Sequence, residues 1–271
     1  MKIANSTLAG VLAAAATVIS AGCFDNREAP RQAPEARSLE ALSKCDRAAL
    51  ERLLLRGRAT AADLSAPGFF AGLPALKELD VAGTGIETVP AAAADGSLPA
   101  LEHLYLGDNA RLRELPPSLF SKNPNLSYLN LDRSGVTNLP ASLGEASRLR
   151  WLRLNGTGVS ALPESLAALK DLRRIYARNC RLSAVPEQLK GMEKLEDIAL
   201  DGNAAISAFP DWIAALPAIR NISLGGTKIS KLPDDLSGLE KLSTLTLVDC
   251  PLPMEERHRI REALPAVSIQ F

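Results

Sequence analysis

The 271-residue chain is poor in the residues that usually carry catalysis or bind metals. It has only two histidines, His103 and His258, and they lie far apart in the sequence. Its glycine-containing loops are repeat turns, and none is a glycine-rich phosphate-binding loop followed by both a lysine and a helix. Basic and acidic residues both number 31, so the net charge gives no reason to expect nucleic acid as a partner. We therefore expect no enzymatic activity, no metal site and no cofactor.

The chain also lacks a long apolar run. Residues Leu8 to Ile19 form a run of 12, whereas a membrane-spanning helix needs about 20. This run follows a positively charged start and precedes small residues, which predicts a signal peptide over residues 1–23. The sequence Ser-Ala-Gly-Cys at its end resembles the lipobox of bacterial lipoproteins, although Ser20 stands where leucine is preferred. The resemblance implies lipidation of Cys23 and an outer-membrane location on the periplasmic or surface side; the alternative is ordinary cleavage and secretion.

An internal repeat dominates the remaining sequence. Successive units are spaced by 25, 25, 23, 23, 23, 24 and 23 residues. Within a unit, leucine or a similar residue occupies positions 1, 4 and 6, a small polar residue or cysteine occupies position 9, and a Leu-Pro pair follows, as in Leu149 to Pro163. The eight units begin at Leu76, Leu101, Leu126, Leu149, Leu172, Leu195, Ile219 and Leu242.

The pattern inside each unit predicts a strand followed by a helical turn. Alternating apolar and polar residues, as in Leu152-Arg153-Leu154, indicate a short strand with one buried face. Leucines three residues apart after a proline, such as Leu166 and Leu169, indicate one or two helical turns. One unit cannot bury its own apolar edge, so the units must stack, and their strands must form a parallel sheet.

The motif Leu-x-x-Leu-x-Leu-x-x-(Asn/Thr/Cys/Ser)-x-Leu resembles the leucine-rich repeat family from about Leu76 to Pro253. The Leu-Pro ending resembles the 23-residue class of that family. The resemblance implies an α/β solenoid in a right-handed horseshoe arc, with a parallel sheet on the concave face and short helices or turns on the convex face. It also implies that the side chain at position 9 bonds the backbone of neighbouring loops, and that the partner is a protein or peptide, a glycan also being compatible.

The segments around the repeats have their own composition. Residues 24–37 are charged and contain prolines, which predicts a disordered tether. Residues 38–75 are expected to form an N-terminal cap, with a helix from Ser38 to Leu55 and a degenerate first repeat from Ala59 to Leu73. Repeats fill residues 76–253, and residues 254–271 form a C-terminal cap with a helix and a last strand. We expect a single-domain monomer.

Four cysteines could indicate disulfides in an exported protein. Cys180 and Cys250 occupy the same position of units three repeats apart, so with strands about 4.8 Å apart they lie on the order of 14 Å from each other. A disulfide requires Cα atoms within about 7 Å. Cys45 belongs to the cap, and Cys23 is assigned to lipidation. We therefore expect no disulfide among them.

The outward positions 3, 5 and 7 of each predicted strand should line the concave face. All three tyrosines of the chain and one of its two tryptophans occupy these positions. Exposed Tyr, Trp and Arg dominate the energetics of protein interfaces, which indicates a binding surface on repeats 2 to 5. Its candidate residues are His103, Tyr105, Tyr128, Asp132, Trp151, Arg153, Arg174, Tyr176, Arg178 and Asp197, with further acids at Glu78, Asp80 and Asp201.

Three functions remain open from the sequence. The first is a binding module of the bacterial envelope. The second is a secreted effector that acts on a host protein, and the third is a structural spacer whose aromatic residues only stiffen the sheet. A catalytic domain is not expected, because only 18 residues follow Pro253.

Overall fold

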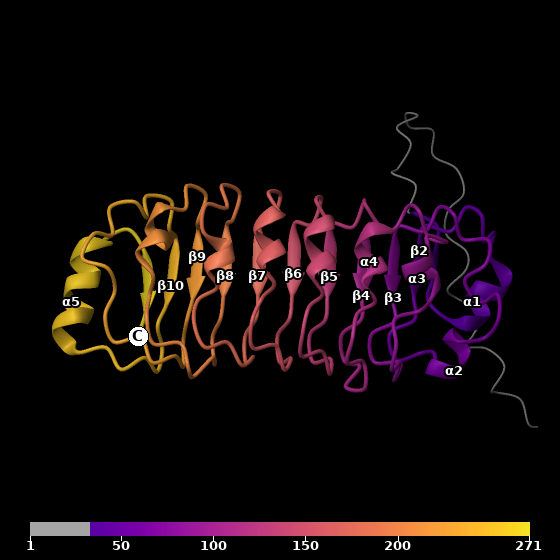
Figure 1. The fold of residues 1–271 in the computed structure, drawn as a ribbon, viewed down its shortest axis with the longest axis horizontal. Coiled ribbons are helices and arrows are strands. Elements are labelled where there is room, and N and C mark those ends of the chain that lie inside the picture. The colour runs from indigo at the N-terminus through magenta and orange to yellow at the C-terminus, as the bar shows by residue number, and fades with distance from the viewer. Residues whose placement is uncertain (1–32) are drawn as a thin grey trace, which may run out of the picture. The chain divides into compact units, whose positions relative to one another are not determined.

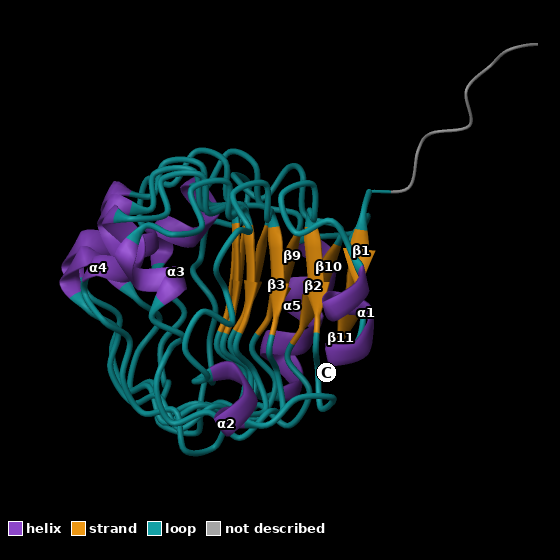
Figure 2. Cartoon of the chain, turned by 90° about the vertical axis from the view of Figure 1, so that its right-hand side faces the viewer, coloured by secondary structure: helices purple, strands orange, loops and turns teal. Residues whose placement is uncertain are grey.

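The computed structural model of the protein describes residues 33–271, whose strands form one parallel sheet (Figures 1 and 2). The predicted signal peptide, Cys23 and most of the predicted tether lie outside the described residues. Each strand pairs with its neighbours in the sequence, so strand order equals chain order. The 11 strands are β1 (Glu35–Ala36), β2 (Arg52–Leu54), β3 (Glu78–Asp80), β4 (His103–Tyr105), β5 (Tyr128–Asn130), β6 (Trp151–Arg153), β7 (Arg174–Tyr176), β8 (Asp197–Ala199), β9 (Asn221–Ser223), β10 (Thr244–Thr246) and β11 (Ser268–Gln270).

Strands β3 to β10 coincide with positions 3 to 5 of the predicted repeats. The register pairs equal positions of successive units, so that Tyr128 lies beside Trp151 and Trp151 beside Arg174. Leu149, Leu152 and Leu154, at positions 1, 4 and 6 of one unit, are fully buried. Burial of such a side chain contributes roughly 1.5–3 kcal/mol, and it depends on the neighbouring units. The predicted fold class, a parallel-sheet leucine-rich repeat solenoid, is confirmed.

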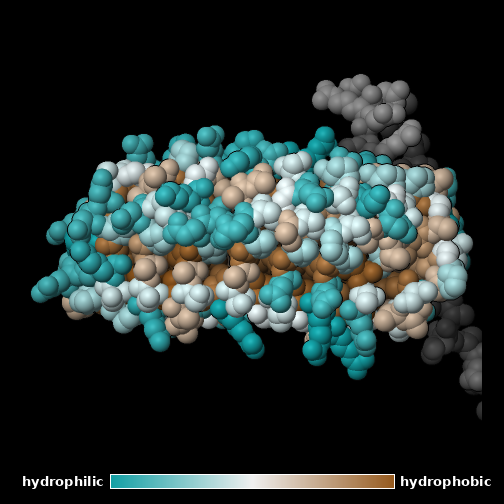
Figure 3. Space-filling model, in the orientation of Figure 1, coloured by the Kyte–Doolittle hydropathy of each residue, from teal (hydrophilic) through white to brown (hydrophobic). Residues whose placement is uncertain are grey.

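Short helices cover the side of the sheet opposite the outward positions (Figure 2). The two 25-residue units contain α-helices α3 (Ala92–Asp95) and α4 (Ser118–Ser121). Most of the following units have shorter connections after the Leu-Pro pair and contain 3-10 helices, at Ala141–Glu145, Glu164–Ala168, Glu187–Leu189 and Asp211–Ala215. Viewed from this side, apolar residues form a band along the solenoid between polar margins (Figure 3). No helix among residues 33–271 is long and apolar enough to cross a membrane.

Each of the strands β2 to β10 ends in a turn that needs a left-handed backbone at position 8. This residue has a positive φ in every unit. In every unit but the last, its N–H bonds the position 7 carbonyl of the next unit, as Gly156 does with Arg178 at 2.7 Å. Glycine adopts this conformation without strain, which explains its frequency here. The residues concerned are Gly57, Gly83, Asp108, Arg133, Gly156, Asn179, Gly202, Gly226 and Asp249.

The side chain at position 9 bonds the loop backbone in seven of the eight predicted repeats, as the family resemblance implied, and Ser134 is the exception. Asn109 Nδ2 donates to the carbonyls of Val81 at 3.1 Å and Leu106 at 2.9 Å, and its Oδ1 accepts from the Gly85 N–H at 2.9 Å. Asn203 repeats this arrangement four units later. A single buried side chain therefore satisfies three backbone groups that would otherwise be unpaired.

The N-terminal cap differs from its prediction. The expected helix from Ser38 to Leu55 is instead a shorter helix, α1 (Leu39–Lys44), followed by strand β2. Leu50, Leu53 and Leu55 are at positions 1, 4 and 6 of an additional repeat, and Gly57 is its left-handed position 8. Leucines with this spacing suit either a helix or a repeat, and pairing of β2 with β3 decides in favour of the repeat.

The first and last segments of the sheet complete the two ends. Residues Glu35–Ala36, placed by the sequence at the end of the tether, form β1 and pair with β2. The second half of the additional repeat contains α2 (Ala61–Leu64), which Thr60 caps. At the other end, helix α5 (Met254–Ala263) covers the core and β11 pairs with β10.

Candidate functional site

The outward side chains of β4 to β7 form one continuous row of rings. We call the side of the sheet that carries positions 3, 5 and 7 the strand face, and this row the aromatic strip. Tyr128 lies at its centre, with ring centroids 4.8 Å from Tyr105, 5.1 Å from Trp151 and 6.0 Å from His103. Trp151 in turn meets Tyr176 at 5.9 Å. Since every contact joins neighbouring strands, the parallel register assembles the strip from residues 23 to 25 positions apart.

Three arginines extend the aromatic strip towards β8. The guanidinium carbon of Arg174 lies 4.7 Å from the centroid of Trp151. Those of Arg153 and Arg178 lie 5.7 Å and 5.5 Å from the centroid of Tyr176. A cation at these distances is attracted by the ring quadrupole, and the contact is worth about 0.5–1 kcal/mol at an exposed site. These contacts hold the long arginine side chains against the sheet.

Each of these arginines also pairs with an aspartate of a neighbouring unit. Arg153 Nε donates to Asp132 Oδ2 at 2.8 Å, Arg178 Nε donates to Asp201 Oδ2 at 2.7 Å, and Arg174 Nε lies 3.0 Å from Asp197 Oδ2. The sequence indicated a basic surface bordered by acids. The structure corrects this description, because one strand spacing brings each acid to an arginine and balances its charge.

Burial gives the tyrosines of the strip a raised pKa. The pKa of Tyr105 rises to about 12, through burial and then through the negative charge of Glu78. Burial also raises the pKa of Tyr128 and of Tyr176, the latter with a further contribution from Asp197. The three rings are half-buried and stay neutral across the physiological range, so they offer ring faces and neutral hydroxyls to a ligand.

Arg52 and Arg56 on the strand face were missed from the sequence. Arg52 Nε donates to Glu78 at 2.7 Å, and Arg56 Nε donates to Asp80 at 3.1 Å. Both arginines belong to the repeat that begins at Leu50, which the sequence analysis treated as a helix. The signal that could have found them is the triplet Leu50, Leu53 and Leu55 followed by glycine at position 8.

Within residues 33–271, no group of three or more His, Cys, Asp or Glu side chains could hold a metal ion. In that same range, Cys45, Cys180 and Cys250 are free, as expected. Cys180 donates to the Leu154 carbonyl at 3.1 Å, and burial raises the pKa of its thiol, which disfavours the reactive thiolate.

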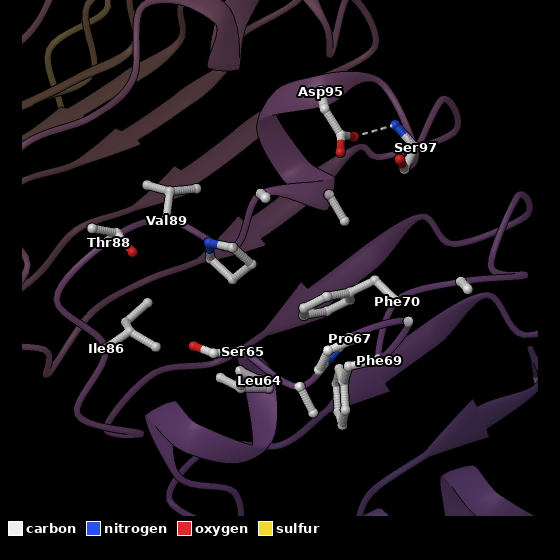
Figure 4. A pocket seen from close by; sticks show the side chains of 16 residues that line it. Leu64, Ser65, Pro67, Phe69, Phe70, Ile86, Thr88, Val89, Asp95 and Ser97 are labelled. Carbon is white, nitrogen blue, oxygen red and sulfur yellow. Dashed lines mark hydrogen bonds between the residues drawn. The ribbon is translucent and has the colours of Figure 1, made fainter.

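A cavity of about 510 Å³ lies near the N-terminal end, between the loop after α2 and helix α3 (Figure 4). Most of the residues that line it are of apolar types, such as Phe69, Phe70 and Ile86, although polar and apolar atoms share its surface about equally. The one ionisable residue that lines it is Asp95, whose carboxylate accepts a hydrogen bond from the Ser97 N–H at 2.8 Å. The only ionisable side chain that lines the cavity is therefore already hydrogen-bonded within the protein.

A sequence model of the leucine rich repeat matches residues 99–159, which include strands β4, β5 and β6. No curated protein sequence matches the chain. The sequence comparison thus identifies the repeat in the segment that carries most of the aromatic strip.

Solved structures share the fold over most of the described chain. A leucine-rich repeat protein of Leptospira interrogans is 27% identical with a TM-score of 0.74, covering 83% of this chain and 55% of that protein. The plant peptide hormone receptor RGFR1 in complex with RGF2 is 22% identical with a TM-score of 0.60, over 79% and 34% of the two chains. The leucine-rich repeat domain of the type III effector XopL is 25% identical with a TM-score of 0.57, over 77% and 78%. The chain thus spans about half of the Leptospira protein and about a third of the receptor.

Proposed function

We propose that this leucine-rich repeat protein is a non-enzymatic binding module that recognises a protein or peptide partner through the aromatic strip and its arginines. The observation that carries the proposal is the uninterrupted row of rings over four neighbouring strands, β4 to β7. The structural likeness to a peptide hormone receptor in complex with its peptide supports a partner of this class.

Energetic arguments favour this surface over the rest of the strand face. Trp, Tyr and Arg bury a large area when they meet a partner, and the rings lose little rotamer freedom. The contacts of Trp151 and Tyr176 with the arginines have already ordered these side chains in the free protein. Binding therefore avoids part of the entropy cost of ordering an interface, about 0.5–1.5 kcal/mol per side chain.

The test is a capture experiment with the immobilised full chain and an envelope extract. Its variants are the triple substitution W151A/R174A/Y176A and the matched control T244A/T246A, which removes outward side chains from β10 on the same face. Wild type and control should retain the same partner, and the triple variant should lose it while its circular dichroism is unchanged. Equal capture by the triple variant would refute the proposal, and no capture by any variant would favour a structural spacer.

We further propose an envelope location, on the basis of the sequence around Cys23. A lipid at that residue would anchor the solenoid through the residues between Cys23 and β1. Metabolic labelling with a radioactive fatty acid tests this. Wild type should incorporate label and Cys23→Ala should not; label in neither protein would favour free secretion.

A second candidate function is that of a secreted effector that acts on a host protein. The likeness to the repeat domain of the type III effector XopL favours it. This function requires release from the producing cell, whereas the envelope module requires retention. Fractionation of cells that produce the wild-type chain therefore separates the two candidates.

A further inference from the structure

Asp132, the most buried acid beside the aromatic strip, has no oxygen available to a partner. Its Oδ1 accepts from the Asn155 N–H at 2.8 Å and its Oδ2 accepts from Arg153 Nε at 2.8 Å. The side chain is only 5% exposed. A ligand that carries a positive charge could reach this carboxylate only by breaking bonds that already satisfy it.

Asp197 and Asp201 are occupied in the same way. Asp197 Oδ1 accepts from Asn221 Nδ2 at 2.6 Å, and its Oδ2 accepts from the Tyr176 hydroxyl at 3.1 Å. Asp201 Oδ1 accepts from the Gly225 N–H at 3.0 Å, and its Oδ2 accepts from Arg178 at 2.7 Å. The protein thus uses all the carboxylate oxygens around the C-terminal half of the strip.

The donors of the same region remain partly unused. Within residues 33–271, Arg174 and Arg178 contact their aspartates through Nε, and neither Nη1 nor Nη2 of these residues has an acceptor. Their side chains are 39% and 45% exposed. The amide of Asn155 shows the same polarity, since its Oδ1 accepts the Arg178 N–H at 2.9 Å and its Nδ2 remains for another partner.

The indole of Trp151 offers its ring to a ligand and not its N–H group. Its Nε1 is buried and has no hydrogen-bond partner among the described residues. Formal charges in this region cancel, with three arginines against three aspartates. Hydrogen-bonding capacity does not cancel, because each oxygen of these three aspartates already accepts a bond, whereas the Nη groups of Arg174 and Arg178 donate none within residues 33–271.

We propose that the partner of the strand face is an acidic peptide segment, in which a glutamate or aspartate lies beside an aromatic or aliphatic residue. The carboxylate is held by the free Nη groups of Arg174 or of Arg178, and the apolar side chain packs on Trp151 and Tyr176. This inference rests on the proposed function and specifies its partner. A charge-assisted bond from arginine to carboxylate is about twice as strong as a neutral one, and the planar guanidinium fits the two oxygens of a carboxylate.

A basic segment would be bound less well by the same surface. It would bring further donors to a region whose acceptors are occupied, and it would face the exposed cationic edges of Arg174 and Arg178. Unmatched donors that become buried cost free energy on binding. The unused Nη donors of Arg174 and Arg178 therefore favour an acidic peptide over a basic one, a difference that the net charge of this surface would not predict.

The experiment uses a displayed library of random 12-residue peptides, panned against the immobilised full chain. Binders should be enriched in Asp and Glu together with Trp, Phe or Leu. The best binder is then synthesised with each acid replaced by its amide, and we expect affinity to fall about tenfold or more for the decisive acid. Because this change is made in the peptide, its effect does not depend on how well a protein variant folds.

Protein variants locate the site. R174Q/R178Q should bind the acidic and the amide peptide with similar, weakened affinity, and R174K/R178K should bind with intermediate affinity because lysine keeps the charge and loses the planar fork. T244A/T246A should bind as wild type does. Affinity for the acidic peptide should also fall as salt rises from about 50 mM to about 500 mM.

Each other outcome contradicts the inference in a recognisable way. Binders without acidic enrichment that still depend on Trp151 and Tyr176 would overturn the acidic partner and leave the proposed function intact. Binders that do not depend on these rings would overturn both. Failure to enrich any peptide, together with strip-dependent binding to a glycan array, would replace the peptide by a carbohydrate.

Discussion

Strands β6 and β10 have the same backbone arrangement, but their outward side chains differ in chemistry. Leu152 and Leu245, at position 4 of the two units, are both fully buried. Outward, β6 carries Trp151 and Arg153, whereas β10 carries Thr244 and Thr246. The inward positions therefore build the fold in every unit, and the outward positions vary without affecting it. The fold does not require the contacts among the outward side chains of β6 and its neighbours. These contacts therefore call for a functional explanation.

The largest expected loss of stability comes from a substitution at an inward position, which the two strands have in common. Leu152→Ala should lower the free energy of unfolding by about 2–5 kcal/mol, because it leaves a cavity in a fully buried position. Its neighbour Trp151→Ala should cost less, about 0.5–1.5 kcal/mol for each aromatic pair that the substitution removes. Urea denaturation followed by circular dichroism measures both. Equal destabilisation of the two variants would contradict the division between scaffold and surface.

A smaller effect is expected at the C-terminal cap. Glu256 is buried and accepts from Leu232 N–H at 2.8 Å, and the bond from Arg259 holds the pKa of its carboxyl below the usual 4.5. A lowered pKa in the folded state gives stability that is present above about pH 4.5 and is lost as pH falls through the folded value. Glu256→Gln should cost about 1–3 kcal/mol at neutral pH and flatten this acid dependence. If the free energy of unfolding of the variant still fell with pH as in wild type, another group would be the cause of the acid sensitivity.

At high pH the contribution of tyrosine ionisation to stability should arise in the aromatic strip, since it holds all three tyrosines of the chain. Burial raises the pKa of Tyr105 to about 12, so the folded state favours the neutral phenol. Its stabilising contribution is present below pH 10 and is lost as pH rises towards 12. Absorbance at about 295 nm should therefore show ionisation later than in the unfolded chain. Ionisation of all tyrosines near pH 10 without unfolding would contradict the packing of the strip.

The smallest effect is expected for T244A/T246A. Both side chains are half-exposed and face the solvent side of β10. Surface substitutions away from special contacts change the free energy of unfolding by about 0.5 kcal/mol or less. Thermal denaturation at matched concentration checks this. A large loss of stability would mean that this end of the strand face has a packing role.

Much of this architecture could be predicted from the sequence, because inward leucines recur with a fixed spacing. The strands β3 to β10 and the last strand followed from that pattern. The repeat at Leu50 was missed, because leucines three and five residues apart suit a helix as well. The pairs of Arg153 with Asp132 and of Arg178 with Asp201 were also missed. A repeat register places residues on neighbouring strands, but the direction of a long side chain depends on rotamers and local contacts.

The identity of strand order and chain order has a consequence for how this molecule can change length. Every unit meets only the units before and after it, so a whole 23-residue unit could be inserted between β8 and β9 without rethreading any strand. Such a duplication would separate the aromatic strip from the C-terminal cap by one further strand spacing, about 4.8 Å. The distance between ligand and cap is therefore adjustable in discrete steps, and the chemistry of the strip stays the same.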